Sequence, residues 1–534
     1  MNQYVQAHAS IYTCVCIQAK LKLQQQQQPK MMSEKFPDVF TWIQNIPQIT
    51  KWNTTSLSFC ICHSASGFPN STLDLIAQRN PSPKIPTFSI IVQSNNHPPL
   101  YLWTSKQELN INPNSPNPFD EQTITSLLVS FVESILTYTS NSSNCSTIKV
   151  PNPDPSMING LKEIFNTVIL TLSFLVCVYE APLYLRENCL NTLRNHLVTC
   201  HARQATTSLM KFLGSNLEEQ WMRSVNLAIT NWIIERKDTR SDYKTTTTPL
   251  FSYAFSAYGL WKVQLYCPIE AMEVERSSNP TADSRLLFSL KFNQLEGVMQ
   301  FNHKVVVRDK WIDVIVKIDN IRFDVIKLVN ERLMSRKGAG EHEKHFPSRI
   351  SLHITPTLQT DFISVSVSKS SNNPGREFEV ERSIEGSFDP PNSLGLRVAG
   401  REASTMTMTP WKFEQSVLGY TANLNWILYD SSVGGREVFT TKPSRFSIMS
   451  PRSWFKDRYA RAYRSFTRRG GVIFAGDEYG ESVVWKIGKG ALGRRMEWEI
   501  KGSIWLTYWP NKYKTFYHET RRLEFTQLLH LTID

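Results

Sequence analysis

The spacing of apolar residues changes once along this chain, near Pro249. Before that point apolar residues recur every three or four positions, as on the buried face of a helix; after it they recur at every second position, as on one face of a strand. Segments rich in Gly, Pro, Asn and Ser separate these later runs. About a dozen such runs predict antiparallel sheets, most simply a sandwich or two stacked sandwiches.

The alternation is clearest in several runs of the C-terminal half. The shorter runs place apolar residues two positions apart: Leu286, Phe288, Leu290 and Phe292; Ile312, Val314, Val316 and Ile318; Phe378, Val380 and Ile384; and Leu424, Trp426 and Leu428. Longer runs follow from Met496 to Tyr508 and from Leu523 to Ile533. Because strand order does not follow from alternation alone, the topology of these sheets stays open.

The N-terminal half begins with a mixture of strands and helices. We expect strands over Leu57–Cys62, Phe88–Val92 and Leu100–Trp103, with loops rich in Asn, Pro and Ser between them. A helix is expected after Asp120, because the apolar residues that follow recur at helical spacing.

Further helices are predicted up to the linker. Asn216 with Glu219 has the spacing of a capping box, and the helix that follows carries one apolar stripe. The stripe consists of Leu217, Trp221, Val225, Ala228 and Trp232. This part of the chain is therefore expected to be helical and packed.

The most apolar stretch of the chain is Ile164–Tyr179. It is shorter than the ~20 residues that a bilayer requires, and its ends carry Glu163 and Glu180 in place of Lys or Arg anchors. We therefore predict a buried core helix, with a single membrane span as the less favoured alternative.

These patterns divide the chain. Residues 1–31 include a run of five glutamines and have no signal-peptide or transit-peptide layout, so we expect a disordered extension. We expect a helix-rich α/β domain over 32–235, a polar linker over 236–249, and an antiparallel β domain over 250–534. The predicted fold class is α+β: an N-terminal helix-rich α/β domain followed by a large antiparallel β-sandwich-like region.

A glycine cluster matches a nucleotide-binding fingerprint without its context. Gly488, Gly490 and Gly493 have the spacing G-x-G-x-x-G, which holds a pyrophosphate only where a strand leads into a helix. Here a strand pattern begins at Arg494. We therefore expect a hairpin turn and no nucleotide site.

No metal site or other cofactor site is predicted. His342 and His345 lack zincin spacing and lie among charged residues, which indicates a charged loop. Cys60 and Cys62 are expected to share one buried face of a strand, and no second ligand pair accompanies them. The nine cysteines are an odd number spread thinly, so they indicate no disulfide framework and favour a reducing, cytoplasmic setting.

One segment raises the hypothesis of binding to an anionic surface. The chain has 59 Lys and Arg residues against 47 Asp and Glu residues, a net charge of +12, and half of this charge lies between Arg452 and Arg469, the basic-aromatic segment. Its candidate binding residues are Arg452, Lys456, Arg458, Arg461, Arg464, Arg468, Arg469, Trp454, Tyr459 and Tyr463. A helix here would suit anionic lipid or, less well, nucleic acid. The favoured interpretation is that the aromatic side chains close one end of the sandwich while the arginines extend into water.

Four stretches resemble a family of uncharacterised plant proteins. They are Lys310–Val314, Gly470–Gly480, Trp505–Lys512 and Phe516–Phe525, and the resemblance runs from about Met32 to the end. It implies a plant source. Because the family has no assigned activity, the resemblance implies no catalytic or binding residue.

Together these features favour a non-enzymatic interaction or scaffold protein of a plant cell, with an unknown protein partner. No combination of nucleophile, base and electrophile is visible in the sequence. The first alternative is a peripheral membrane protein that binds anionic lipid through the basic-aromatic segment. The second is an enzyme whose site is assembled from distant residues such as His353, Asp477, Glu478 or His518.

Overall fold

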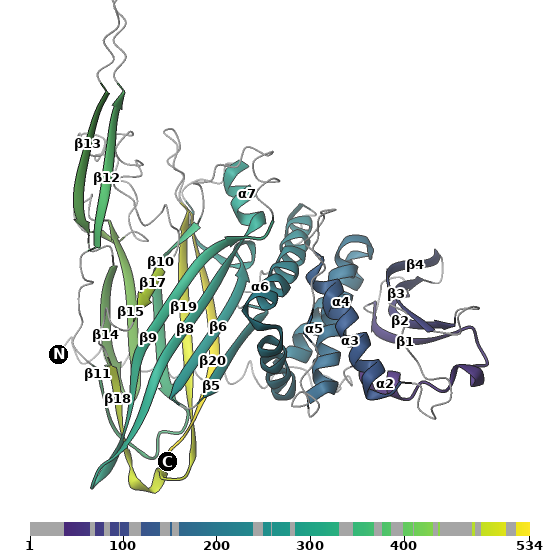
Figure 1. The fold of residues 1–534 in the computed structure, drawn as a ribbon, viewed down its shortest axis with the longest axis horizontal. Helices are drawn as coiled ribbons and strands as arrows, with labels where there is room; N and C mark the ends of the chain where they lie inside the picture. Colours follow the sequence, from purple (N-terminus) through teal and green to yellow (C-terminus); the bar gives the residue numbers. More distant parts are fainter. Residues whose placement is uncertain are drawn as a thin grey trace, which may run out of the picture.

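The computed structural model describes the chain in separate stretches (Figure 1). They are residues 37–64, 70–79, 86–94, 97–105, 119–138, 150–151, 160–238, 249–257, 259–277, 284–329, 345–367, 376–385, 399–408, 411–430, 436–437, 472–475, 482–508 and 519–534. Helices and a small sheet make up the N-terminal part, and large antiparallel sheets make up the C-terminal part. The predicted α+β class is confirmed.

The N-terminal sheet is an antiparallel meander. Its strands, in both chain and spatial order, are β1 (Ser56–His63), β2 (Ser71–Arg79), β3 (Pro86–Ser94) and β4 (His97–Thr104). The predictions for β1, β3 and β4 are confirmed. The sequence did not indicate β2, because its residues Leu73–Ala77 are all buried and so show no alternation.

Strand β1 contains a β-bulge that separates its two cysteines. The register shifts between Cys60 and Cys62, so Cys62 is buried while Cys60 is half-buried, with its Sγ 3.2 Å from Nδ1 of His63. The predicted shared buried face is therefore wrong for Cys60. Burial, together with the nearby Asp74 carboxylate, raises the pKa of Cys60 to about 12, so its thiol stays protonated at neutral pH.

A bundle of helices packs against this small sheet (Figure 1). It consists of α2 (Val39–Gln44), α3 (Glu121–Leu136), α4 (Leu161–Glu180), α5 (Leu183–Val198) and α6 (Cys200–Asp238). The side chain of Asp120 caps α3, since its Oδ1 accepts a hydrogen bond from the backbone N–H of Thr123. The predicted start of this helix is thereby confirmed.

Helix α4 lies at the centre of the bundle. Its length and composition would allow it to cross a membrane, yet 83% of its apolar window is buried inside the protein. Two of its polar side chains have partners within the bundle: Asn166 accepts a hydrogen bond from the backbone of Phe40, and Thr167 bonds Nε2 of His196. This arrangement favours the predicted core helix over a membrane span.

Helix α6 lies between the other helices of the bundle and the large sheets (Figure 1). It consists of two helical runs joined at Gly214, where φ is 71° and ψ is 169°, a conformation that favours glycine. The second run buries the predicted stripe, including Trp221 and Trp232. The helix continues to Asp238, so the first residues of the predicted linker over 236–249 are helical.

Two seven-stranded antiparallel sheets form the C-terminal part. The spatial order of the first sheet is β11 (Phe362–Val367), β18 (Ser482–Gly488), β9 (Trp311–Lys327), β8 (Asn293–Val307), β6 (Leu260–Pro268) and β5 (Phe251–Ala257). Strand β17 (Val472–Ala475) also pairs with β9. The spatial order of the second sheet is β14 (Trp411–Leu418), β15 (Thr421–Asp430), β10 (His345–Pro356), β19 (Arg495–Tyr508), β20 (Glu519–Thr532) and β7 (Glu273–Ser277). Strand β16 (Arg436–Glu437) also pairs with β15.

The two sheets pack face to face through buried tryptophans. The ring of Trp498 from the second sheet lies 5.3 Å from Trp261 and 6.1 Å from Trp485, both of the first sheet. All three side chains are fully buried. The C-terminal part is therefore a sandwich, as the alternation predicted.

Two details of the sandwich correct the sequence prediction. Residues Leu286 to Phe292, predicted as a strand, belong to helix α7 (Ser284–Phe292). Leu286 and Leu290 are four positions apart, a spacing that also fits one face of a helix, and both are buried. The turn at Gly488 to Gly493 is not a hairpin, because it leads through a 3₁₀ turn from β18 in one sheet to β19 in the other.

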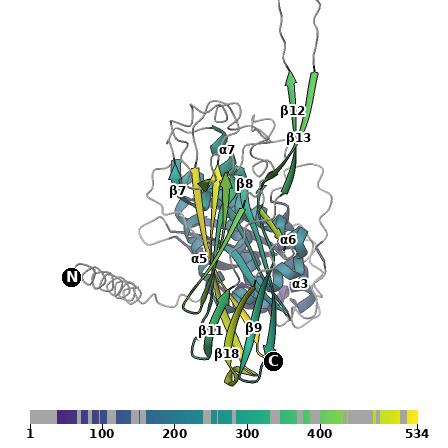
Figure 2. The same cartoon turned by 90° about the vertical axis from the view of Figure 1, so that its left-hand side faces the viewer.

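A further pair of strands extends beyond the sandwich. Strands β12 (Arg376–Glu385) and β13 (Ala399–Met408) pair only with each other among the described strands. Figures 1 and 2 show them projecting past one end of the large sheets.

Candidate functional site

The basic-aromatic segment lies outside the described residues. The ten residues predicted to bind an anionic surface are Arg452, Trp454, Lys456, Arg458, Tyr459, Arg461, Tyr463, Arg464, Arg468 and Arg469, and the structure says nothing of them. Their role stays a prediction.

Most residues of the predicted enzyme site also lie outside the described part of the chain: Asp477, Glu478 and His518. His353 is described and lies on β10, where its Nδ1 is 2.6 Å from Oδ1 of Asn423 on the neighbouring strand β15. His353 and Asn423 lie directly opposite each other where β10 pairs with β15, so their contact is an ordinary contact between neighbouring strands. The described residues thus provide no support for a site around His353.

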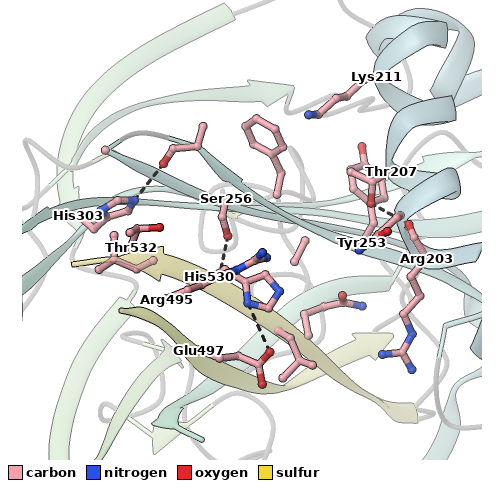
Figure 3. A pocket seen from close by; sticks show the side chains of 18 of the residues that line it. Arg203, Thr207, Lys211, Tyr253, Ser256, His303, Arg495, Glu497, His530 and Thr532 are labelled. Carbon is pink, nitrogen blue, oxygen red and sulfur yellow. Dashed lines mark hydrogen bonds and ion pairs between the residues drawn. The ribbon is translucent and has the colours of Figure 1, made fainter. Parts of the chain in front are cut away.

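A different feature stands out, a groove where helix α6 meets the edge of the sandwich (Figure 3). It encloses about 1220 Å³ and is lined by residues of α6, β5, β8, β19 and β20. We call it the junction groove. Because these elements are distant in the sequence, only folding brings the lining together.

Helix α6 forms one wall of the junction groove. Arg203, Thr207 and Lys211 are spaced four residues apart, so they lie along one face of the helix. Figure 3 shows all three on the side of α6 that meets the groove. The ammonium group of Lys211 lies 4.0 Å from the ring centroid of Phe255 on β5, a cation–π contact between the two walls.

The floor of the groove joins an edge strand of one sheet to a strand of the other. The side-chain amide of Gln527 donates a hydrogen bond of 2.5 Å to Oγ of Ser252, and the backbone N–H of His530 donates one of 3.0 Å to Oγ of Ser256. Both bonds connect β20 to β5. They fix the position of the groove floor relative to both sheets.

Two histidines in the groove are neutral at neutral pH. Burial lowers the pKa of His303, whose Nε2 lies 3.1 Å from the carbonyl oxygen of Ala257. Burial and the positive charge of Arg495 lower the pKa of His530. The Nδ1 atom of His530 lies 3.4 Å from a carboxylate oxygen of Glu497 (Figure 3).

The charged lining of the groove is mainly basic. Its permanent cations are Arg203, Lys211, Lys304 and Arg495, and its carboxylate side chains are Glu497 and Asp534. The cations come from both walls, two from α6 and two from the sheets. At neutral pH the side chains of the lining therefore carry a net positive charge.

A buried network holds α6 in place behind the groove. The hydroxyl groups of Tyr253 and Tyr266 lie 2.6 and 2.7 Å from Oε1 of Glu218 on α6. Burial raises the pKa of both tyrosines and of Glu218. Further along the helix, Asn226 donates a hydrogen bond of 2.6 Å to Gln294 of β8. The second helical run of α6, after Gly214, is thus anchored to the first sheet.

Two kinds of catalytic arrangement were sought among the described residues of the chain. Among its described lining residues, no hydroxyl group is hydrogen-bonded to an imidazole ring, so no base-activated nucleophile is formed. The described part of the chain also contains no cluster of three or more His, Cys, Asp or Glu residues that would hold a metal ion.

Sequence reasoning did not single out the junction groove. The available signal was the row of polar residues at positions 203, 207 and 211, on the face of a helix whose other side is apolar. That row identifies an exposed face, and only the fold shows which strands lie opposite it.

Comparisons with known proteins do not identify the chain. No family model matches it, and no curated protein matches it. Among solved structures, Clostridium perfringens delta-toxin is 10% identical, with a TM-score of 0.23, over 52% of this chain and 96% of that one. The Clostridium perfringens NetB toxin in its membrane-inserted form is 9% identical, with a TM-score of 0.18, over 52% and 92%. Likeness at these TM-scores assigns neither a fold nor a function.

Proposed function

We propose that the protein is a non-enzymatic binding module whose junction groove takes an elongated ligand with more than one phosphate or carboxylate group. The observation that carries this proposal is the placement of cations on both walls of one groove. Arg203 and Lys211 lie on α6, while Lys304 and Arg495 lie on the strands opposite.

The residue types of the groove support an anionic ligand. Arginine pairs with carboxylate and phosphate through a planar fork of donors, and lysine binds phosphate as a compact charge. Hydroxyl groups of Ser208 and Thr532 add neutral donors along the same lining. Glu497 and Asp534 disfavour a ligand that is negative along its whole length, so we expect its anionic groups to be spaced apart.

The size of the groove supports a ligand larger than a single phosphate ion. Its volume of about 1220 Å³ exceeds the ~300–1,000 Å³ typical of pockets for small molecules. The exposed ring surface of Phe255, which is only partly buried beneath Lys211, offers an apolar contact between the charged ends. An elongated ligand would use both features.

This proposal is tested by calorimetric titration of the full chain with inorganic tripolyphosphate. The double variant Arg203→Gln with Lys211→Gln should bind roughly ten- to a hundredfold more weakly than the parent, since it loses two charge-assisted contacts. The control is Arg322→Gln with Lys501→Gln, two exposed basic residues outside the groove. Equal weakening in both double variants, or no binding by the parent, would contradict the proposal.

A second candidate function is peripheral binding to anionic membranes through the basic-aromatic segment. Its support is the local charge between Arg452 and Arg469, which combines basic and aromatic side chains. In either function we expect a cytoplasmic setting, as the cysteine usage predicts, and a scaffold role with a protein partner is compatible with both.

A further inference from the structure

Four connections between strands meet at one end of the sandwich. Residues 308–310 join β8 to β9, residues 357–361 join β10 to β11, residues 419–420 join β14 to β15, and residues 489–494 join β18 to β19. We call these connections, with the two strand residues on either side of each, the tip. Figures 1 and 2 show this end of the sandwich near the labels of β11, β18 and the C-terminus.

Hydrogen bonds and strand pairing hold the four connections together. The backbone N–H of Gly488 donates a hydrogen bond of 2.8 Å to the carbonyl oxygen of Asp361. The indole N–H of Trp485 on β18 donates one of 2.9 Å to the carbonyl oxygen of Tyr420. Gly488 also lies opposite Trp311 where β18 pairs with β9, which places the first connection at the same end. The tip is therefore one surface built from both sheets.

Large apolar side chains are exposed on this surface. Of the thirteen such side chains that are exposed in the described part of the chain, six lie at the tip: Val307, Leu358, Ile363, Val417, Leu418 and Leu492. Leu358 and Leu418 are the two most exposed of all, at 71% and 75%. A single exposed apolar residue is ordinary, whereas a group of them at one end marks a binding surface.

The exposed side chains are not needed to hold the tip in shape. Beneath them the buried ring of Phe362 lies 5.9 Å from Tyr420 and 6.0 Å from Trp498. Its neighbour Ile363 points the other way, because successive strand positions face opposite sides. None of the six exposed apolar side chains belongs to the core or to the partly buried residues packed against it.

The tip is also basic. Its cations are Arg308, Lys310, Lys489, Arg494 and Arg495, and its carboxylates are Asp309 and Asp361. Arg494 lies 3.3 Å from Asp361, and Arg308 lies 3.0 Å from Asp313 just beyond the tip. Two further carboxylates nearby, Glu497 and Asp534, belong to the junction groove. The tip itself keeps an excess of positive charge.

A bilayer with anionic headgroups fits both features of the tip. Apolar side chains on such a surface bury themselves at the boundary between headgroups and acyl chains, and neighbouring cations attract anionic lipids. Lys310 and Lys489 are exposed and have no ion-pair partner among the described residues, so they are available to headgroup phosphates. Lysine is depleted at protein–protein interfaces, which favours lipid over a protein partner.

We propose that the tip binds the surface of a bilayer that contains anionic phospholipids. Leu358, Leu418 and Leu492 insert among the lipids, while Lys310 and Lys489 contact headgroup phosphates. The half-buried Trp311 lies beside them, and tryptophan is enriched at this boundary. The site is separate from the basic-aromatic segment and does not rest on the function proposed for the junction groove.

The test is sedimentation of the full chain with vesicles of phosphatidylcholine alone and of phosphatidylcholine with phosphatidylserine. The parent should bind the mixed vesicles more tightly. The tip variant, with Leu358→Ser, Leu418→Ser and Leu492→Ser, should bind the mixed vesicles about tenfold or more weakly than the parent. The matched control, with Val198→Ser, Val274→Ser and Leu287→Ser, removes three exposed apolar side chains far from the tip in sequence and should bind as the parent does.

A second variant separates charge from insertion. Lys310→Gln with Lys489→Gln should weaken binding to the mixed vesicles about tenfold and leave binding to phosphatidylcholine unchanged. All variants should keep the thermal unfolding midpoint of the parent, because the changed side chains lie outside the core. Mixed vesicles should also slow amide hydrogen exchange in residues 357–361 and 489–494 of the parent.

Three results would overturn the proposal. The first is no binding of the parent to either kind of vesicle, or an equal loss of binding in the tip variant and its matched control. The second is slower hydrogen exchange confined to the basic-aromatic segment, which would place the membrane contact there. The third is self-association of the parent without vesicles that the tip variant loses, which would assign the tip to a second copy of the chain.

Discussion

Gly502 of β19 lies directly opposite Phe525 of β20, and the phenyl ring of Phe525 occupies the space that a side chain at position 502 would need. The first sheet repeats this arrangement: Gly297 of β8 lies opposite Phe323 of β9, whose ring covers the glycine. In each sheet, therefore, an aromatic ring covers the glycine of a neighbouring strand and fills the interior of the sandwich.

Replacing Gly502 with valine should destabilise the protein by about 1–3 kcal/mol, since the added carbon atoms collide with Phe525 and with Leu352 behind it. Urea unfolding of the purified chain measures this loss. Gly490→Ala is the control, because nothing lies within 4 Å of a methyl group there. A Gly502→Val variant as stable as the control would show that the ring moves aside without cost.

Trp498 joins the two sheets, and its truncation should be among the most destabilising changes in the sandwich. It contacts Phe362 at 6.0 Å between ring centroids, besides the tryptophans of the first sheet. We expect Trp498→Ala to lower the free energy of unfolding by about 3–5 kcal/mol. Trp498→Phe should cost less, because its phenyl ring fills much of the space that alanine would leave empty. Urea unfolding of both variants measures the two losses of stability. A larger loss for Trp498→Phe than for Trp498→Ala would contradict the packing described for Trp498.

Glu296 should make the protein less stable as pH rises. Burial, and then the negative charge of Glu219, raise the pKa of Glu296 to about 7 from an ordinary value of 4.5. Between these values the folded chain keeps a proton that the unfolded chain releases, so the free energy of unfolding falls as pH increases through this range. Glu296→Gln should remove this loss and raise stability at about pH 8 by up to about 3 kcal/mol relative to the parent.

The comparison of Glu296→Gln with the parent needs two pH values. At about pH 5 the parent carboxyl group is protonated in the folded state and, with an ordinary pKa of 4.5, about three-quarters ionised in the unfolded state, so the variant should differ from the parent by much less than at about pH 8. Urea unfolding at both pH values gives the two differences. A difference that does not change with pH would mean that Glu296 is already ionised in the folded chain at about pH 5.

The basic-aromatic segment gives a separate prediction. Substitution of Arg461, Arg464, Arg468 and Arg469 by glutamine should weaken sedimentation of the chain with anionic liposomes, since four charges are lost from the segment. The melting temperature should stay unchanged if these side chains extend into water. Unchanged sedimentation, or no sedimentation of the parent, would remove the membrane function assigned to this segment.

The fold class and many of the strands could be predicted from the sequence because one face of each strand is buried and the other is not. Strand β9 shows this: Ile312, Val314 and Val316 are buried at alternate positions. The same rule fails where both faces are covered, as in β2, and over a run as short as α7, where helical and strand spacing coincide at Leu286 and Leu290.

The junction groove could not be predicted in the same way, because its lining spans positions from Arg203 to Asp534. Periodicity places a residue on one face of its own element. It does not say that α6 lies against the edge where β5 and β20 meet, which depends on the order of the strands. Sequence patterns therefore indicate the exposed residues of each wall separately, and only the fold shows that Lys211 lies over the ring of Phe255.

The most direct test of the anionic ligand is a crystal structure of the full chain grown with tripolyphosphate. We predict density for the anion in the junction groove, within hydrogen-bonding distance of Arg203 or Lys211 on one wall and of Lys304 or Arg495 on the other. An anion bound only elsewhere on the surface, with an empty groove, would contradict the proposed function.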